Sequence, residues 1–255
     1  MAWERSDGAR VLAGVSPAAR PWIARLVDAD ASTRVAGLDA IGGALLSDGE
    51  PTPQAEDLLP ALLELAATKG YPQAGGVLLR LSHLLAAIDD PPRGLAGAGG
   101  SEARRRAYDF VGASAARLVR LAGTSRDPSV ARLAGCLAAR FPDQDASLEP
   151  ILIALTSGAR DAEERARVFY ALTRVQTARG RPLQGRLAEA LSHAEPTPEK
   201  VAVSLALSAH DPTEPLRGRI RRTLGDARET RLPDPRAPGR TLTAATLDAA
   251  LTRLG

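Results

Sequence analysis

The chain has 255 residues, of which 44% are hydrophobic but only 3% are aromatic, and its formal net charge is +3 at pH 7. A core with so few aromatic side chains must be built from Leu, Ala, Val and Ile, and this favours an all-α fold because Leu and Ala are strong helix formers. The single cysteine, Cys136, excludes an internal disulfide framework and a cysteine-based metal cage.

No stretch of the sequence approaches the roughly 20 apolar residues of a membrane span, and the N-terminal residues lack the apolar core of a signal peptide. We therefore expect a cytoplasmic protein without a membrane partner. The positive charge is nearly all arginine. It indicates either recognition of phosphates or a compositional bias, and the near balance of 33 basic against 30 acidic residues favours the bias.

The N-terminal half is predicted to form helices separated by clear breaks. Residues 1–16 are expected to be frayed, and Ser16-Pro17 is typical of a helix start. Asp30 and Ser32 are expected to cap a second helix that carries Val35, Leu38, Ile41 and Leu45 on one face, and Gly42-Gly43 would allow a close helix contact.

The break at 47–53 is followed by a helix that ends near Thr68. This helix is expected to begin near Leu59, with Pro60 in its first turn, or else to be kinked at Pro60. A strongly apolar helix is predicted over 72–88. The Pro- and Gly-rich stretch 89–100 is a candidate joint between two halves. A helix of some 20 residues from Ser101 follows, with Phe110 and Val111 among its inward residues.

Residues 127–228 contain one 34-residue pattern three times, beginning at Asp127, Asp161 and Glu195. Each copy consists of an acidic cap, a helical pattern, a break, a second helical pattern and a polar turn. Such a period is typical of a helical solenoid. The runs 151–155 and 201–207 could be strands, but they occupy helix positions in the repeat and are predicted to be helical. Residues 229–255 are expected to form a linker and a C-terminal capping helix.

The segment DPSVARLA at 127–134 resembles the HEAT-repeat family and its armadillo-like relatives, and looser versions occur at 30–38 and 161–168. The resemblance covers 17–228, about five helix pairs. It implies a right-handed α–α superhelix whose second helices line a concave, partner-binding surface, and it implies no chemistry.

The sequence contains no recognisable catalytic motif. His83, His193 and His210 lie far apart without metal-binding spacing, so no metal, cofactor or catalytic residue is predicted and the protein is expected not to be an enzyme. The run 97–101 before a helix is a weak candidate for an anion cradle, since it lacks the residues of a phosphate-binding loop.

Charge on the second helices is the strongest functional signal. Acidic residues come first (Glu56, Asp57 and Glu64) and arginines later, which would give a groove running from acidic to basic. The candidate binding residues are Arg104, Arg105, Arg117, Arg186, Arg217 and Arg221. The alternative is that these are scattered, solvated side chains.

Two classes of function are consistent with these sequence features. The first is a non-enzymatic scaffold that binds a protein with an acidic patch in the groove, for example as a regulator or a toxin-neutralising protein. The second is a HEAT-like DNA-repair glycosylase or another nucleic-acid-binding protein with a basic groove. The scarcity of aromatic side chains for stacking on bases favours the scaffold, and the oligomeric state is left open.

Overall fold

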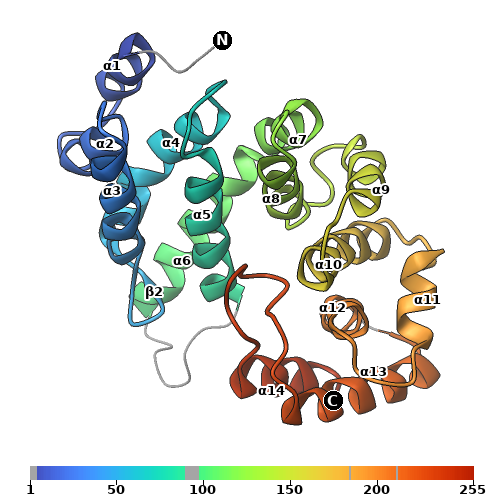
Figure 1. Ribbon diagram of the computed structural model, residues 1–255. Helices are drawn as coiled ribbons and strands as arrows, with labels where there is room; N and C mark the ends of the chain where they lie inside the picture. The colour runs from blue at the N-terminus through green and yellow to red at the C-terminus, as the bar shows by residue number, and fades with distance from the viewer. Residues whose placement is uncertain (1–4, 90–97, 184, 211) are drawn as a thin grey trace. The chain divides into compact units, whose positions relative to one another are not determined.

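The computed structural model describes residues 5–89, 98–183, 185–210 and 212–255 (Figure 1). These residues fold into fourteen α-helices, a 3-10 turn and one small hairpin, so the prediction of an all-α protein is confirmed. The chain divides into two compact units, unit 1 (Met1–Leu121) and unit 2 (Ala122–Gly255). None of the helices in the described ranges is both long and apolar enough to cross a membrane.

Unit 1 is built from antiparallel helix pairs. Helix α2 packs against α3 and α4 against α5, and the pairs contact each other through α2 with α4 and α3 with α5. The helices are α1 (Arg5–Ala13), α2 (Arg20–Leu26), α3 (Ala31–Leu45), α4 (Pro53–Ala67), α5 (Ala74–Asp89), α6 (Ala98–Ala113) and α7 (Ala115–Thr124), the last of which crosses the division. The core is mainly leucine and isoleucine, including Ile23, Leu26, Ile41, Leu58, Leu62 and Leu78.

Two helix starts in unit 1 follow the capping signals in different ways. Asp30 caps α3, and its carboxylate accepts a hydrogen bond from the Thr33 backbone N–H at 2.7 Å. Ser16 instead begins a turn in which its hydroxyl accepts from Ala19 N–H at 3.3 Å, and α2 starts only at Arg20. On α3, Val35 was predicted to lie on the buried face, but it is 50% exposed.

The helix around Pro60 begins earlier than predicted. Helix α4 starts at Pro53, which occupies a first-turn position, and continues through Pro60. The predicted start near Leu59 is therefore wrong. Proline removes one helical hydrogen bond, but its neighbours Leu59, Ala61 and Leu62 are buried, and their packing favours the continuous helix.

The break at 47–53 contains a hairpin of strands β1 (Leu46–Ser47) and β2 (Glu50–Pro51). Its two turn residues, Asp48 and Gly49, have φ angles of 52° and 80°. Two consecutive positive φ angles match the twist of a tight hairpin, and Asp-Gly is a favoured sequence for it.

Close helix contacts in unit 1 occur at glycines other than the predicted pair. A Cβ atom on Gly37 would lie 3.0 Å from Arg25 Cβ, and one on Gly76 would lie 2.6 Å from Leu38 Cδ1. Of the predicted pair, a Cβ on Gly42 would come no closer than 3.7 Å, to the Arg80 guanidinium, and one on Gly43 would meet no atom within 4 Å. Gly37 and Gly76 therefore permit the contacts of α3 with α2 and α5.

Three further segments of unit 1 differ from the expectation. Residues 5–13 of the expected frayed terminus form α1. The predicted long helix from Ser101 is divided at Ser114 into α6 and α7, and Phe110 is 38% exposed while Val111 is buried. Within the candidate joint 89–100, residues 90–97 lie outside the described residues.

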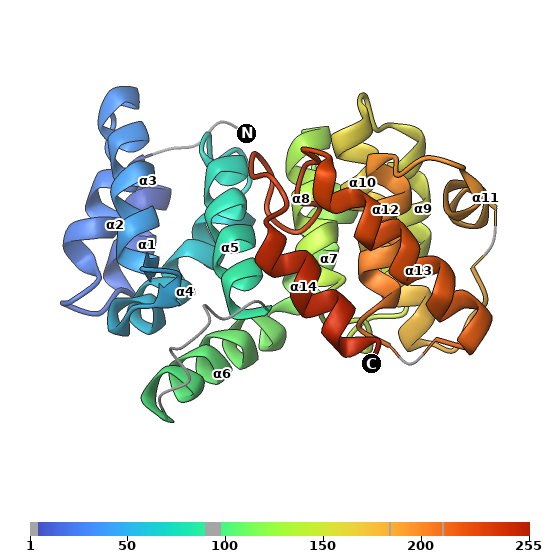
Figure 2. The same ribbon diagram turned by 90° about the horizontal axis from the view of Figure 1, so that it is seen from below.

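Unit 2 contains three consecutive helix pairs, one within each of the three 34-residue segments. They are α8 (Pro128–Ala138) with α9 (Leu148–Ser157), α10 (Ala162–Ala178) with α11 (Arg186–Ser192), and α12 (Pro198–Leu207) with α13 (Glu214–Asp226). The first helices contact one another in order, α8 with α10 and α10 with α12 (Figure 2). The runs 151–155 and 201–207 lie within α9 and α12, so the helical interpretation is confirmed.

The first helices of the repeats have side-chain caps. Asp127 accepts hydrogen bonds from Ser129 and Val130 N–H, and Asp161 accepts one from Glu164 N–H. The third cap was predicted at Glu195 but is Thr197, whose hydroxyl accepts from Lys200 N–H at 3.2 Å. Proline is favoured directly after a cap, and Pro198 fixes this start.

Ion pairs connect consecutive first helices of unit 2. Arg132 of α8 lies 2.8 Å from Glu164 in the first turn of α10, and Arg165 of α10 lies 2.9 Å from Glu199 in the first turn of α12. Each glutamate is at a helix N-terminus, where a negative charge is favoured by the helix dipole. The same type of link is therefore made twice in succession, with the arginine and the glutamate each shifted by one helix position, and we call these two pairs the Arg–Glu ladder.

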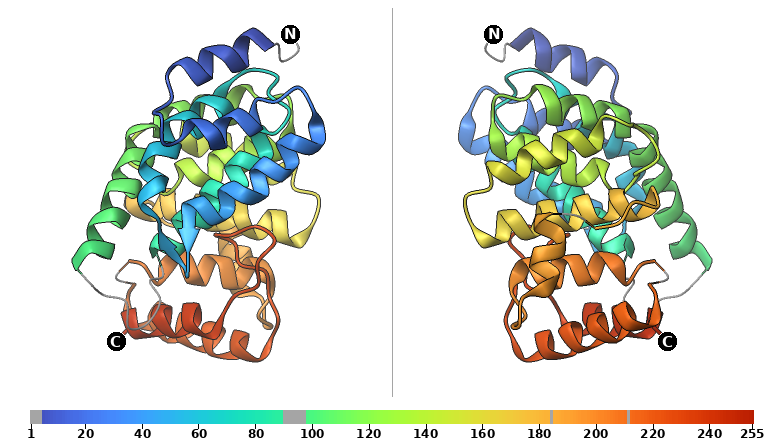
Figure 3. Two further views of the ribbon diagram at one scale, coloured as in Figure 1. Left: turned by 90° about the vertical axis from the view of Figure 1, so that its left-hand side faces the viewer. Right: turned by 90° about the vertical axis from the view of Figure 1, so that its right-hand side faces the viewer.

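The segment expected as a linker after the repeats is an ordered loop, and residues 234–238 are buried. Arg236 binds both carboxylate oxygens of Asp234 at 2.9 and 2.8 Å and also donates to the Thr246 hydroxyl at 3.0 Å. Thr246 belongs to α14 (Ala244–Arg253), which packs against α13 (Figure 3). Between them, η1 (Ala227–Glu229) extends α13 by one short turn.

Candidate functional site

The predicted binding arginines of unit 1 are largely engaged within the unit. Arg104 is paired with Glu50, and Arg117 is paired with Glu64. Arg105 is exposed, and the described part of the chain offers it no partner.

Unit 1 also lacks the expected separation of acidic from basic side chains. Besides Arg117, Glu64 has Arg10 at 3.8 Å, while Arg106 lies 2.7 Å from Glu56. Acidic side chains of α4 and arginines of α6 and α7 therefore neutralise one another, although they are some 50 residues apart in sequence.

The predicted arginines of unit 2 differ in how they are held. Arg217 pairs with Glu214 at 2.7 Å on the same helix. Arg221 donates to the carbonyl oxygens of Leu254, at 2.6 Å, and Gly255, and so fastens the end of α14 to α13. Arg186 is exposed at the start of α11. Of these three arginines, Arg221 is the one that binds the end of α14, so Arg186 and Arg217 are the better choices for substitution.

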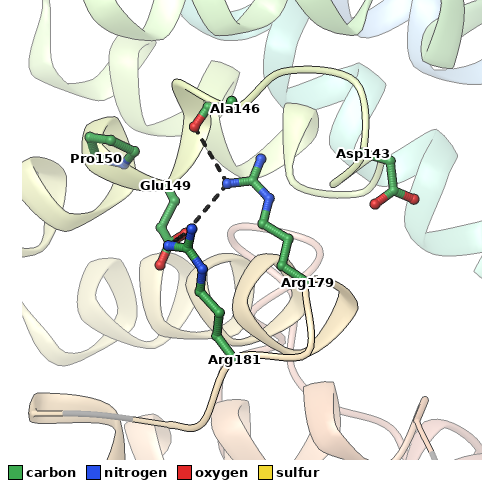
Figure 4. A pocket seen from close by; sticks show the side chains of 6 residues that line it. All are labelled: Asp143, Ala146, Glu149, Pro150, Arg179 and Arg181. Carbon is green, nitrogen blue, oxygen red and sulfur yellow. Dashed lines mark hydrogen bonds and ion pairs between the residues drawn. The ribbon is translucent and has the colours of Figure 1, made fainter.

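A second feature of unit 2 was not predicted from the sequence. A shallow, open hollow of about 450 Å³ lies where the loop before α9 meets the loop after α10 (Figure 4). Its lining residues are Asp143, Ala146, Glu149, Pro150, Arg179 and Arg181. We call it the Arg181 hollow.

A buried carboxylate forms the base of the Arg181 hollow. Glu149, in the first turn of α9, is only 4% exposed. It accepts hydrogen bonds from Arg181 Nη1 at 2.6 Å, from Arg179 Nη1 at 3.3 Å and from Gln176 Nε2 at 3.3 Å. A buried charge is tolerated only when it is paired and hydrogen-bonded in this way.

The end of α10 places the two arginines on the same side. Gly180 has a φ angle of 65°, its N–H donates to Thr177 C=O at 3.0 Å, and Arg181 N–H donates to Gln176 C=O at 2.8 Å. This pair of hydrogen bonds is a standard glycine C-cap. It reverses the chain after Arg179, so that Arg181 also reaches Glu149.

The two arginines have different roles in the hollow. Arg179 is 18% exposed and also donates to the backbone carbonyls of Pro142 and Asp145, at 3.1 and 2.7 Å. It therefore fastens the loop before α9 to the end of α10. Arg181 is 60% exposed, and its side chain makes one hydrogen bond within the described ranges, to Glu149.

The other acidic groups near the hollow do not neutralise Arg181. The Asp145 carboxylate accepts from the Ser147 N–H and hydroxyl at 2.8 and 2.7 Å, and these bonds lower its pKa. Asp143 is exposed and lies across the hollow from Arg181 in Figure 4. Arg181 is thus a positive group that is fixed at one end and open to solvent at the other.

Two further titratable groups, His210 and Cys136, have shifted pKa values. Burial and the nearby Arg174 lower the pKa of His210. Cys136 is partly exposed as a residue, but its thiol is desolvated, and this raises the pKa of the thiol to about 11. Three nearby arginines act in the opposite direction and only reduce the rise. A thiol with so high a pKa is a poor nucleophile. No group of three or more metal-ligating side chains occurs in the described ranges, and the candidate anion cradle at 97–101 lies partly outside them.

Only part of this site can be predicted from the sequence. Arg-Gly-Arg at 179–181 marks a helix C-terminus, because glycine is common there. The partner Glu149 is about one repeat earlier, and no local pattern connects the two. Comparison with known proteins gives no further guidance: no family model, no curated protein and no solved structure matches the chain.

Proposed function

We propose that the protein is a cytoplasmic helical-repeat scaffold of the HEAT-like or armadillo-like type, and that it binds a protein partner without catalysing a reaction. The observation that carries this proposal is the Arg–Glu ladder of unit 2. Similar ion pairs near the starts of successive first helices are expected of stacked repeats, because each repeat contacts mainly its neighbours.

The helix pairs of both units support the same proposal. The pairs α2/α3 and α4/α5 of unit 1 contact each other through their first helices, α2 with α4, as the pairs of unit 2 do through α8, α10 and α12. Together they account for about five pairs, as the sequence resemblance implies. In such an array the second helices would line a concave surface of a right-handed superhelix, and solenoid proteins use such surfaces to bind partners.

The partner that fits the second helices of unit 2 carries an acidic patch. Arg186 and Arg217 supply positive charge on the successive second helices α11 and α13, Arg186 as an exposed side chain and Arg217 as one that is paired with Glu214. Complementary charge across an interface raises the association rate and selects the partner. A regulator or a toxin-neutralising protein would act in this way, by covering a surface of its partner.

The test is an affinity purification from the source organism with matched variants. Wild-type protein is compared with Arg186→Glu/Arg217→Glu, which reverses charge on the proposed surface while leaving Arg221 to hold α14. Arg253→Glu, an exposed residue of α14, is the control for general charge. We expect one partner that is retained by wild type and the control but lost from the double variant.

Two results would replace the proposal. Equal retention by all three proteins would remove the surface from the interaction. If a nucleic acid co-purifies, and a gel shift shows binding to duplex that weakens steeply with salt, the chain would instead be a nucleic-acid-binding protein. A turnover of damaged bases in that complex would make it a glycosylase.

A further inference from the structure

The guanidinium of Arg181 combines fixed orientation with unused hydrogen-bonding capacity. An arginine side chain has five N–H donors, and Arg181 uses one of its nitrogens to bind Glu149 at 2.6 Å. Its backbone is held by the glycine C-cap of α10, so the side chain starts from a fixed point. The side chain lines the hollow and is 60% exposed, so its remaining donors are accessible to a ligand there.

The charge of the cluster favours an anionic ligand. Glu149 is shared by Arg179 and Arg181, so these three side chains together carry one positive charge in excess. The exposed Asp143 makes the lining neutral as a whole, so the excess is local to the arginines. Because Arg179 is satisfied by Glu149 and by loop carbonyls, the excess is available at Arg181. A planar guanidinium with two free donors matches the two oxygens of a carboxylate.

The shape of the hollow selects a side chain carried by a larger molecule. Sites for free small molecules bury most of the ligand surface. The Arg181 hollow is open and shallow, so it covers only one side of an occupant. A carboxylate presented by a polypeptide gains the rest of its binding energy from contacts around the hollow.

We propose that the Arg181 hollow binds an aspartate or glutamate side chain of an acidic peptide segment, through a bidentate contact with Arg181. This rests on the proposed function in that the segment would belong to the protein partner. It adds a contact at the turns between helices, away from the second helices where the sequence places the binding surface. Arg179 and Glu149 are positioning residues, because they orient Arg181 without touching the ligand.

The experiment uses the full chain and a defined probe, a capped hexaglutamate peptide, with capped hexaglutamine as the uncharged control. Fluorescence anisotropy of labelled peptide gives the affinity. The arginine Nε–Hε signals in a ¹⁵N correlation spectrum report the site, and the Arg181 signal is identified by its loss in Arg181→Gln. The matched control is Arg253→Gln, an exposed arginine of α14 in the same unit.

We expect a saturable shift of the Arg181 signal with hexaglutamate and none with hexaglutamine. Arg181→Gln should weaken hexaglutamate binding about tenfold, as expected for loss of a charge-assisted bidentate contact, while Arg253→Gln should bind as wild type. Thermal unfolding should be similar in both variants, because Glu149 keeps Arg179 and Gln176 as partners.

Equal affinity of wild type and Arg181→Gln would overturn the inference, as would an equal loss in Arg253→Gln, which would indicate general charge attraction. The outcome is independent of the purification described above. If Arg181 binds the peptide but no partner is found, the proposed function is wrong and the site stands. If a partner is found but Arg181 does not respond, the site is wrong and the proposed function stands.

Discussion

Replacement of Arg132 by methionine removes the most buried link of the Arg–Glu ladder. The Arg132 side chain is 5% exposed and Glu164 is 14% exposed, at 2.8 Å. Arg132 also donates to Gly158 C=O at 3.1 Å. Methionine keeps most of the aliphatic volume, so the change tests the charge and not the packing.

The expected loss follows from what remains around Glu164. Removing one partner of a buried ion pair costs about 3–5 kcal/mol, because the other charge stays buried. Glu164 keeps one hydrogen bond, from Arg160 N–H at 2.8 Å, and some solvent contact. We therefore expect about 3 kcal/mol, the lower end of that range. The equivalent change Arg165→Met should cost under about 1 kcal/mol, because 39% of the Arg165 side chain is exposed.

The assay is urea unfolding followed by far-UV circular dichroism, with tryptophan fluorescence as an internal reference. Both tryptophans of the sequence lie among the first 121 residues, so their fluorescence reports on unit 1. Hydrogen exchange of peptides from α8 and α10 locates the loss. The double variant Arg132→Met/Glu164→Met should lose less stability than Arg132→Met alone, because no unpaired charge remains. Equal losses for Arg132→Met and Arg165→Met would refute the reasoning from burial.

Three further changes test the local structure by thermal or urea unfolding. Gly37→Ala should destabilise the protein, because its Cβ would press on Arg25, whereas Gly43→Ala should stabilise it by up to about 1 kcal/mol through helix propensity; a gain from both would contradict the close contact. Thr197→Ala should cost about 1 kcal/mol as loss of a helix cap, and Glu195→Ala close to nothing; the reverse order would restore the cap predicted from sequence. Because the pKa of His210 is lowered in the folded state, the unfolded state binds a proton on this side chain more readily, and the free energy of unfolding should fall as the pH drops below about 6.5. A His210→Gln variant should therefore show a weaker pH dependence of stability. Identical pH profiles for wild type and variant would show that His210 does not contribute.

The sequence predicted the helices of this protein well where the signal is local. Asp30, Asp127 and Asp161 are caps because a short acidic side chain can reach the first free N–H groups of the helix that follows. The third cap was misplaced by two residues. Glu195 fits the 34-residue spacing, but Thr197 followed by proline is the stronger physical signal.

Three other errors share one cause, which is contact between residues of different helices. Helix α4 runs through Pro60 because its apolar neighbours are buried by other helices. Gly37 was not singled out, because its importance depends on Arg25 of the preceding helix. The Arg181 hollow was missed for the same reason, since Glu149 and Arg181 are brought together by the packing of two repeats.

The Arg–Glu ladder has a direction, and it stops at α12. Each arginine pairs with a glutamate on the first helix of the next pair. Helix α12 has no arginine, and its only lysine, Lys200, donates to carbonyl oxygens that precede the helix, those of His193 and Ala194, at 2.6 and 3.3 Å. The first helix of a further pair after α13 would therefore have no arginine of α12 to pair with a glutamate in its first turn. In the linear array that we propose, α12 therefore forms no further link of this type, because the positions that correspond to Arg165 and Arg132 hold the buried Val201 and Ala202.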